Sequence, residues 1–439
     1  MNIIRLIGRV CQATIFCTTV VATASFALGT TATPQQFGAK GDCISDDYAA
    51  FRTMFASGKS YHIPAVRFCY VIAVPASGHV VFALPAAATL DGDGRRSKLD
   101  FTISAGGYYR LFSASAADQT FRNFAIEVKA AKPVAQITVF AQAADNLDIE
   151  SLTIDGGMSS AGAQRVYPLQ FVGATNGTHV SNVAITRTSA LGLKRNSDTF
   201  PTRNVYFRGL ITTSMYGPVG LNSPGGPAQN VVVEQSTFGT NLNPGQESYL
   251  VGFSSVKNLR VVRNRFPGSS KSDALHLEEA NDDATIFDNS IEGPHLRGIF
   301  FTDGNHRLAG GRNLSPTTLK IVGNVVRSLA HASIGKDVGV YIHIADPQND
   351  GPFRIEGRLN RVDRYTRCFI ADNVPSTTLL VQDNIFSHCG LGIYLKSGTL
   401  DVRNNDIIDT KISLQVDNAV SISPNRVINS QPTVQRSSH

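Results

Sequence analysis

After its first 30 residues the sequence lacks any long hydrophobic run. No later segment approaches about 18 uninterrupted apolar residues, which is close to the length a membrane-spanning helix requires. Clusters of basic residues are also missing, because the 40 lysines and arginines are spread along the chain among 34 acidic residues. This spreading argues against a nucleic-acid-binding arm. We therefore expect no nucleic-acid partner and, once a leader is removed, no membrane partner, while the mild basic excess suits an acidic ligand.

Amphipathic helical periods and metal-ligand spacings are missing as well. Without long helical segments between the short strands, an alternating strand–helix–strand architecture is excluded. None of the cysteines has zinc-finger spacing, and no cluster of acidic residues resembles a calcium site. The sequence therefore predicts neither a metal nor a cofactor.

Residues 1–29 are predicted to be a signal peptide. Arg5 and Arg9 form a short basic region, and a Thr-rich apolar stretch follows over residues 10–21. Small residues then offer cleavage sites at Ala22, Ala24 and Ala27. Because threonines interrupt this short apolar stretch, a single-pass anchor is the weaker alternative. We expect a secreted or periplasmic protein.

Four cysteines remain after the predicted leader, and they are Cys43, Cys69, Cys368 and Cys389. An even number of cysteines in an oxidising compartment predicts disulfides, with three pairings possible. Proximity in the sequence favours Cys43–Cys69 and Cys368–Cys389.

A short motif recurs along the chain: Asn, Asp or Thr, then an apolar residue, any residue and a second apolar residue. It begins at Asn123, Asn146, Asn182, Asn204, Asn230, Asn258, Asp283, Thr318, Thr378 and Thr399. The steps between the first seven are 22 to 36 residues long. A second short strand follows with an asparagine at its turn, at Asn264, Asn289, Asn324, Asn384 and Asn404. Asparagine suits both left-handed turns and side-chain ladders between stacked turns.

Steps of this length with two or three short strands each are typical of the coils of a β-solenoid. Only a stacked column buries the inward apolar residues of every coil. The sequence thus predicts an all-β, single-domain, right-handed parallel β-helix of ten or more coils over residues 30–423, with a polar, disordered tail over 424–439. The separation of Cys368 and Cys389 is about one coil. Because adjacent coils lie about 4.8 Å apart, this spacing supports their pairing.

Residues 45–58 are predicted to form one short helix. Ser45 or Asp46 can cap its N-terminus and Gly58 ends it. Its apolar stripe consists of Ala50, Phe51, Met54 and Phe55. A solenoid exposes its core at the first coil, so a helix placed there would cap the column.

The segment around this helix resembles a known signature. Phe37-Gly-Ala-Lys-Gly-Asp, then Ser45-Asp-Asp, the helix and Tyr61-His-Ile-Pro-Ala are similar to the N-terminal signature of the pectate-lyase-like superfamily, as in its rhamnogalacturonase/epimerase-like pectate lyase domains. Cys43 replaces the glycine usual in that signature.

This resemblance implies a right-handed parallel β-helix that acts on carbohydrate. The superfamily includes polygalacturonases, rhamnogalacturonases, polysaccharide lyases, uronan epimerases and phage tailspike depolymerases, so the reaction stays open. Trimers are common among its spike-like members, and the oligomeric state of this chain stays open too.

One strand of each coil is expected to contribute outward side chains to a common face. In Ala274-Leu-His-Leu-Glu the second and fourth residues are expected to point into the core and the third and fifth outward. The same rule, applied to neighbouring coils, gives a face rich in aromatic residues, histidine and lysine. Since aromatic rings stack on pyranose rings, we predict a polysaccharide-binding groove, with an ordinary solvated sheet face as the alternative. Its predicted substrate-binding residues are Lys194, Asn222, Arg297, Phe300, Tyr341, His343, Tyr394 and Lys396.

Acidic residues concentrate on two of these coils. Carboxylates one or two coils apart are separated by about 5–10 Å, which spans the geometries of retaining and inverting glycosidases. Glu278 and Asp303 are the first candidates for a catalytic pair, followed by Asp273 and Glu279, with His276 beside them. A neighbouring carboxylate or local burial would raise one pKa and create the general acid.

Two other functions stay open beside hydrolysis. A lyase would abstract the proton next to a uronic carboxyl, which requires a base and a cation that stabilises the developing enolate. The residues that could supply these roles are His276, Tyr341, His343, Lys271 and Arg297. A non-catalytic carbohydrate-binding or adhesion protein is the third function, because the polygalacturonase motifs N-T-D, G-H-G and R-I-K and the epimerase motif D-P-H-D are missing. Cleavage of a polysaccharide, by hydrolysis ahead of elimination, is the leading prediction.

Overall fold

The computed structural model describes most of the chain from residue 31 onward. The described residues are 31–76, 79–130, 136–160, 165–192, 199–222, 228–243, 248–278, 283–302, 318–329, 336–344, 353–372, 377–396, 399–416, 421–422, 424–430 and 434–435. Residues 31–439 form one compact unit. The predicted signal peptide lies outside the described residues, and within them no helix has the length and apolar character needed to cross a membrane.

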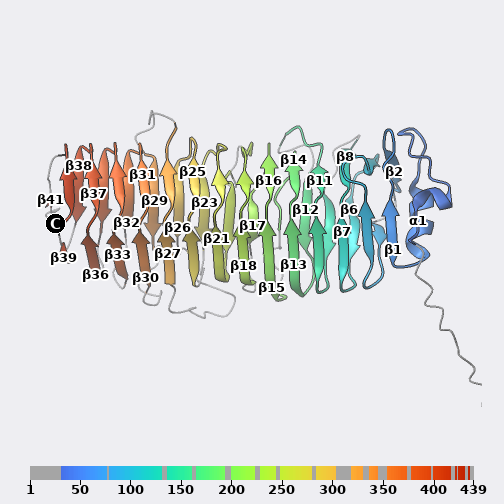
Figure 1. Ribbon diagram of the computed structural model, residues 1–439, viewed down its shortest axis with the longest axis horizontal. Coiled ribbons are helices and arrows are strands. Elements are labelled where there is room, and N and C mark those ends of the chain that lie inside the picture. Colours follow the sequence, from blue (N-terminus) through green and yellow to red (C-terminus); the bar gives the residue numbers. More distant parts are fainter. Residues whose placement is uncertain are drawn as a thin grey trace, which may run out of the picture. The chain divides into compact units, whose positions relative to one another are not determined.

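Parallel strands from successive coils stack into a β-solenoid (Figure 1). In the described part of the chain every strand pair is parallel, so equivalent side chains of successive coils form rows along each sheet. The predicted all-β parallel β-helix with a short N-terminal helix is therefore confirmed.

Two sheets of 14 strands each run along the column. Sheet I contains β1 (Ser60–Ile63), β4 (Thr89–Gly92), β7 (Gln119–Arg122), β10 (Leu147–Glu150), β13 (Thr175–Ser181), β15 (Thr202–Arg208), β18 (Ala228–Glu234), β21 (Val256–Val262), β24 (Ala284–Phe287), β27 (Thr318–Val322), β30 (Arg354–Arg358), β33 (Thr378–Gln382), β36 (Thr399–Arg403) and β39 (Ser421–Ile422). Sheet II contains β2 (Tyr70–Val74), β5 (Lys98–Ile103), β8 (Ala125–Ala130), β11 (Thr153–Asp155), β14 (Ala184–Thr186), β16 (Ile211–Thr213), β19 (Thr237–Phe238), β22 (Arg265–Phe266), β25 (Ser290–Glu292), β28 (Val325–Arg327), β31 (Arg361–Asp363), β34 (Ile385–Ser387), β37 (Asp406–Ile408) and β40 (Arg426–Ile428).

Two shorter sheets complete the coils. Sheet III belongs to the N-terminal coils and contains β3 (Val80–Ala83), β6 (Tyr108–Ala114), β9 (Gln136–Gln142) and β12 (Val166–Phe171). Sheet IV belongs to the later coils and contains β17 (Val219–Asn222), β20 (Val251–Ser254), β23 (Asp273–Glu278), β26 (Arg297–Thr302), β29 (Val338–His343), β32 (Arg367–Asp372), β35 (Leu391–Leu395), β38 (Ile412–Val416) and β41 (Val434–Gln435). The inward residues of all four sheets pack into one continuous hydrophobic core.

The recurring sequence motif serves two sheets rather than one. Some of its asparagines directly precede sheet I strands or lie within them, as Asn146 and Asn204 do, whereas Asn123 and Asn182 stand two residues before the first residue of a sheet II strand. The predicted 36-residue step from Asn146 to Asn182 is therefore not a coil, and the equivalence of these two positions is wrong. Both kinds of turn need a left-handed residue before an apolar pair, and these asparagines have φ of 54 to 59°.

Asparagines at the turn from sheet I to sheet II form a buried ladder. Each side-chain amide donates to the carboxamide oxygen of the next coil's asparagine, at 2.9–3.1 Å. Each of these oxygens also accepts the backbone N–H of the preceding asparagine. The ladder members are Asn264, Asn289, Asn324, Asn360, Asn384, Asn405 and Asn425. Asn405 occupies the place predicted for Asn404, which instead has positive φ.

Helix α1 (Tyr48–Ala56), preceded by the 3-10 helix η1 (Pro34–Phe37), lies at the first coil. Its buried residues are the four of the predicted stripe, Ala50, Phe51, Met54 and Phe55. Asp47 occupies the N-cap position in place of the predicted Ser45 or Asp46. Its carboxylate does not cap the helix, because it accepts the backbone N–H groups of Lys40 and Gly41 at 2.7 and 3.2 Å.

Both predicted disulfides are confirmed. Cys43 and Cys69 tie the segment before α1 to the first coil, with 4.7 Å between their Cα atoms. Cys368 and Cys389 join adjacent coils near the other end, with 5.9 Å between their Cα atoms.

Strand pairing continues beyond residue 423, where the sequence predicted a polar tail. Strand β40 pairs with β37, and β41 pairs with β38. An ion pair between Arg426 and Asp406 joins the two last coils, because opposite charges stand at paired positions of β40 and β37.

Candidate functional site

The polar face predicted from the sequence lies on sheet IV. In β23, Leu275 and Leu277 are fully buried, whereas His276 and Glu278 are partly exposed, as the predicted inward and outward positions require. His276 pairs with Phe300 in β26, and Phe300 pairs with Tyr341 in β29. Strands β23, β26 and β29 therefore bring predicted site residues into one row.

Asp273, His276, Glu278 and Arg297 form an ion cluster on β23 and β26 of this face. Asp273 is 0% exposed and accepts both Nε and Nη2 of Arg297, the latter at 2.9 Å. His276 Nδ1 contacts the same carboxylate at 2.5 Å, and its Nε2 contacts Glu278 Oε2 at 3.1 Å. Because Asp273 is buried and contacts two cationic side chains, its carboxylate fixes the positions of His276 and Arg297 from below the surface.

The ion cluster makes His276 a cation at neutral pH. Burial lowers the pKa of His276, but the hydrogen bonds and negative charges of Asp273 and Glu278 outweigh burial and raise the pKa to about 9. Both ring nitrogens contact carboxylate oxygens, so both carry protons in the charged form. The cluster thus holds two adjacent cations, with His276 paired to Asp273 and Glu278 and Arg297 paired to Asp273.

Aromatic rings surround these cations. The Tyr249 ring is stacked on His276 with 4.6 Å between ring centroids, and Phe300 lies on the other side of His276 at 5.1 Å. The guanidinium carbon of Arg297 lies 3.5 Å from the centroid of Phe300, in cation–π geometry. Phe300 was predicted to face outward, yet it is only 7% exposed, because Arg297, His276 and Tyr341 cover it.

A second polar group adjoins the ion cluster. Asp372, at the end of β32, accepts the hydroxyl of Tyr341 at 3.0 Å and contacts His343 Nδ1 at 2.6 Å. Burial and the charge of Asp372 raise the pKa of Tyr341 to about 12. An ionised carboxylate only accepts hydrogen bonds, so His343 Nδ1 carries a proton, and in the neutral ring Nε2 can accept one. This is the arrangement of a general base oriented by a carboxylate.

Asp372 and Tyr249 were not among the predicted site residues. In β32 Asp372 follows the buried run Cys368–Ala371, which has no alternation to mark an outward position. Tyr249 precedes β20, outside the strand pattern. Only the register of β29 and β32 could have indicated Asp372, because it pairs with His343.

A buried histidine lies below the ion cluster. Ser270 donates its hydroxyl to the backbone carbonyl of Asp273 at 2.9 Å, so His295 Nδ1 must donate to the Ser270 oxygen, at 2.7 Å. Burial lowers the pKa of His295 to about 4, although the negative charge of Asp273 acts to raise it. His295 is therefore neutral, and it supports the start of β23 at the point where Asp273 enters the site.

The remaining predicted site residues are spread along the same sheet or fall outside the described residues. Tyr394 and Lys396 lie on or just after β35, where Tyr394 pairs with Ile370 of β32. Asn222 ends β17 and pairs with Ser254 of β20. Lys194, Glu279 and Asp303 lie outside the described residues, so the Glu278–Asp303 and Glu279 pairings stay predictions.

Comparison with known proteins gives likeness in fold only. No protein-family model and no curated protein sequence matches this chain. Among solved structures, the tailspike protein gp49 from Pseudomonas phage LKA1 is 11% identical, with 92% of this chain and 81% of the tailspike covered and a TM-score of 0.53. Tailspike protein 3 of bacteriophage CBA120 is 13% identical over 92% of this chain, with a TM-score of 0.50, and the match spans 62% of that tailspike's length.

The chain shares the parallel β-helix fold of these tailspikes. The fold implied by the resemblance to the pectate-lyase-like superfamily is thereby confirmed. At this level of identity a shared fold does not carry a reaction from one protein to another, so the reaction has to be argued from the side chains of sheet IV.

Proposed function

We propose that this protein is an exported enzyme that binds an acidic polysaccharide along sheet IV and cleaves it by β-elimination. The observation that carries the proposal is that one face of sheet IV holds the cations Arg297 and His276 and the oriented base pair of His343 and Asp372. The two disulfides are typical of proteins from oxidising compartments and support export.

Arg297 would bind a uronate carboxylate, with His276 offsetting the negative charge of the two carboxylates beside it. Asp273 engages Nε and Nη2 of Arg297, so Nη1 has no partner among the described residues and can donate to a ligand. His276, a cation at neutral pH with a pKa of about 9, contacts Asp273 and Glu278 through both ring nitrogens and so offsets their negative charge beside Arg297. Fixed positive charge beside the carboxylate stabilises the negative charge that develops when the neighbouring carbon loses its proton.

The acid and base of the elimination would come from β29. His343 Nε2 takes the proton from the carbon next to the carboxylate, and the electron pair of that C–H bond forms a new carbon–carbon double bond. The bond to the glycosidic oxygen breaks as this double bond forms. Tyr341 remains protonated at neutral pH because its pKa is about 12, and it is our candidate to protonate the departing oxygen. The products are an unsaturated sugar and a new reducing end.

Hydrolysis has less support from the described residues. It requires two carboxylates about 5 to 9.5 Å apart. Glu278 and Asp372 occupy the same row but are three strand positions apart, which puts their Cα atoms about 14 Å from each other. Each is also held toward a histidine, Glu278 toward His276 on its own strand and Asp372 toward His343. We therefore favour elimination over hydrolysis.

The test is to incubate the purified protein with a panel of neutral and uronic polysaccharides and to follow reducing ends and ultraviolet absorbance together. Both signals should rise on a uronic polymer. His343→Gln should lower the rate by about 10²- to 10⁴-fold, the usual contribution of a general base. The matched control is His388→Gln, because His388 Nδ1 contacts Asp363 at 2.7 Å in the same way but at the end of a sheet II strand. This control should keep the parent rate.

Other outcomes would contradict the proposal in distinct ways. Reducing ends without absorbance would indicate hydrolysis and return attention to Glu278 and Asp303. Binding to a polymer without any product would indicate a carbohydrate-binding or adhesion protein.

A further inference from the structure

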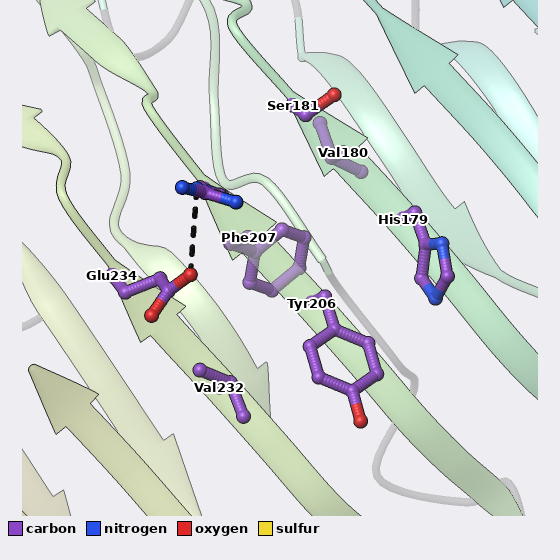
Figure 2. Close-up of a pocket in the computed structure, with 8 residues that line it drawn as sticks. His179, Val180, Ser181, Tyr206, Phe207, Val232 and Glu234 are labelled. Atoms are coloured by element: carbon purple, nitrogen blue, oxygen red, sulfur yellow. Dashed lines mark ion pairs between the residues drawn. The ribbon is translucent and has the colours of Figure 1, made fainter.

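A hollow on the outward face of sheet I lies apart from the candidate active site. Its volume is about 410 Å³, and its lining includes His179, Ser181, Tyr206, Arg208, Val232 and Glu234 (Figure 2). These residues come from β13, β15 and β18, and none belongs to sheet IV. Ligand pockets typically have volumes of about 300–1,000 Å³, so this hollow is large enough for a sugar residue.

An exposed aromatic ring forms the floor of the hollow. Tyr206 stands between His179 and Val232 in one row of sheet I, as Figure 2 shows. The His179 ring is nearly perpendicular to it at 5.0 Å, and the short Val232 leaves room on the other side. Tyr206 is 41% exposed, and its hydroxyl has no partner among the described residues. Tyrosine combines a flat apolar surface with a polar end, which suits a binding site better than a solvated sheet face.

A polar pair lies beside this ring, in the next outward row. Arg208 Nε lies 3.4 Å from Glu234 Oε1 and donates to Gln235 Oε1 at 2.9 Å. The two η-amino groups of Arg208 have no partner among the described residues, so they remain available as donors. The dashed line in Figure 2 marks this ion pair at the edge of the hollow. Donors and an acceptor thus stand next to each other at one side of an aromatic floor.

Arg208 and Glu234, the two lining residues of the hollow that carry a permanent charge, have opposite signs. Arg208 faces Glu234, and His179 Nδ1 lies 3.2 Å from Asp148. A hollow lined by one pair of opposite charges does not require an anionic ligand. Neighbouring hydroxyls of a sugar match the adjacent donors and acceptor, and the apolar face of a pyranose matches the tyrosine ring.

We propose that this hollow is a second saccharide-binding site, which holds one neutral pyranose residue of a polysaccharide chain. The sugar ring lies on Tyr206, and its hydroxyls bond to Glu234 and Arg208. This inference rests on the proposed function in one respect, that the ligand is a polysaccharide, and it does not depend on cleavage. Such a site would hold a long chain on the column while the sheet IV site acts on another part of it.

The experiment measures binding to an array of neutral and uronic oligosaccharides. The parent protein and Arg297→Ala are compared first, because the latter weakens binding at sheet IV. Tyr206→Ala is then added to Arg297→Ala, and Tyr108→Ala is added separately as the matched control. Tyr108 is also an exposed tyrosine, 56% exposed at the start of β6 in sheet III.

We expect Arg297→Ala to keep its binding to neutral oligosaccharides. Adding Tyr206→Ala should weaken this binding about tenfold or more, as the loss of a central aromatic contact commonly does. Tyr206→Phe should restore it, and Tyr108→Ala should leave it unchanged. Circular dichroism spectra like that of the parent, with cooperative thermal unfolding, will show that the variants fold.

Two results would overturn the second site: equal binding with and without Tyr206, or no binding of any neutral oligosaccharide by Arg297→Ala. The failure of the proposed function looks different. In that case the protein binds through Tyr206 but releases no product from any polymer.

Discussion

Replacing His276 by glutamine will show how much the ion cluster contributes to stability and at which pH. Asp273 and Glu278 outweigh burial and raise the pKa of His276 from 6.5 to about 9. Each tenfold change in proton affinity corresponds to about 1.4 kcal/mol, so this increase corresponds to roughly 3 kcal/mol of folding free energy. The folded state binds the proton more tightly than the unfolded state does. The contribution is therefore fully present below pH 6.5 and is lost as the pH rises through 9.

Urea unfolding of the parent and His276→Gln at about pH 6 and about pH 10 measures this contribution. The difference in unfolding free energy between the two proteins should fall by roughly 3 kcal/mol over this interval. NMR titration of the His276 ring should give an inflection near pH 9, and Asp273→Asn should move it downward. An inflection at or below 6.5, or a difference in stability that does not change with pH, would refute the reasoning.

Two further predictions concern the architecture. Asn324→Ala should destabilise the column by about 2 kcal/mol or more, because it leaves the backbone N–H and amide of Asn289 without their buried acceptor. The control is Asn258→Asp, an exposed change that introduces the residue found at the equivalent position of the next coil, Asp283. It should lower the free energy of unfolding in urea by no more than about 0.5 kcal/mol. If Asn324→Ala and Asn258→Asp cost the same, the ladder does not contribute as we propose. Replacing both Cys368 and Cys389 by serine should cost about 3 kcal/mol. It should speed amide hydrogen exchange in β35 and β38 but not in α1, and a uniform change would contradict a local role for this disulfide.

Local patterns carried the prediction of the fold. The motif of an asparagine followed by two apolar residues can be recognised within the sequence of one coil. Because it recurs in successive coils, only a stacked column can bury all of its apolar residues. The alternation in β23 was enough to place Leu275 and Leu277 inward and His276 and Glu278 outward. The same patterns gave a wrong equivalence where two kinds of turn both use a left-handed asparagine, because Asn146 and Asn182 satisfy one motif but belong to turns of different sheets.

The side chains that meet in the candidate site could not be identified from the sequence, because they come together through contacts between coils. Asp273 and Arg297 are 24 residues apart, and their pairing follows from the register of β23 and β26. Asp372 reaches His343 across the next pair of strands, β29 and β32, from a strand whose apolar run hides its outward position.

The β-helix, its capping helix and its disulfides could be predicted from the amino-acid sequence, because each depends on spacing along the chain. Contacts between coils determine which carboxylate is buried, which histidine is charged and which aromatic ring is covered. A charge state depends on all the groups around it, and here those groups come from different coils. His276 is the clearest case, since its pKa of about 9 results from burial opposed by Asp273 and Glu278.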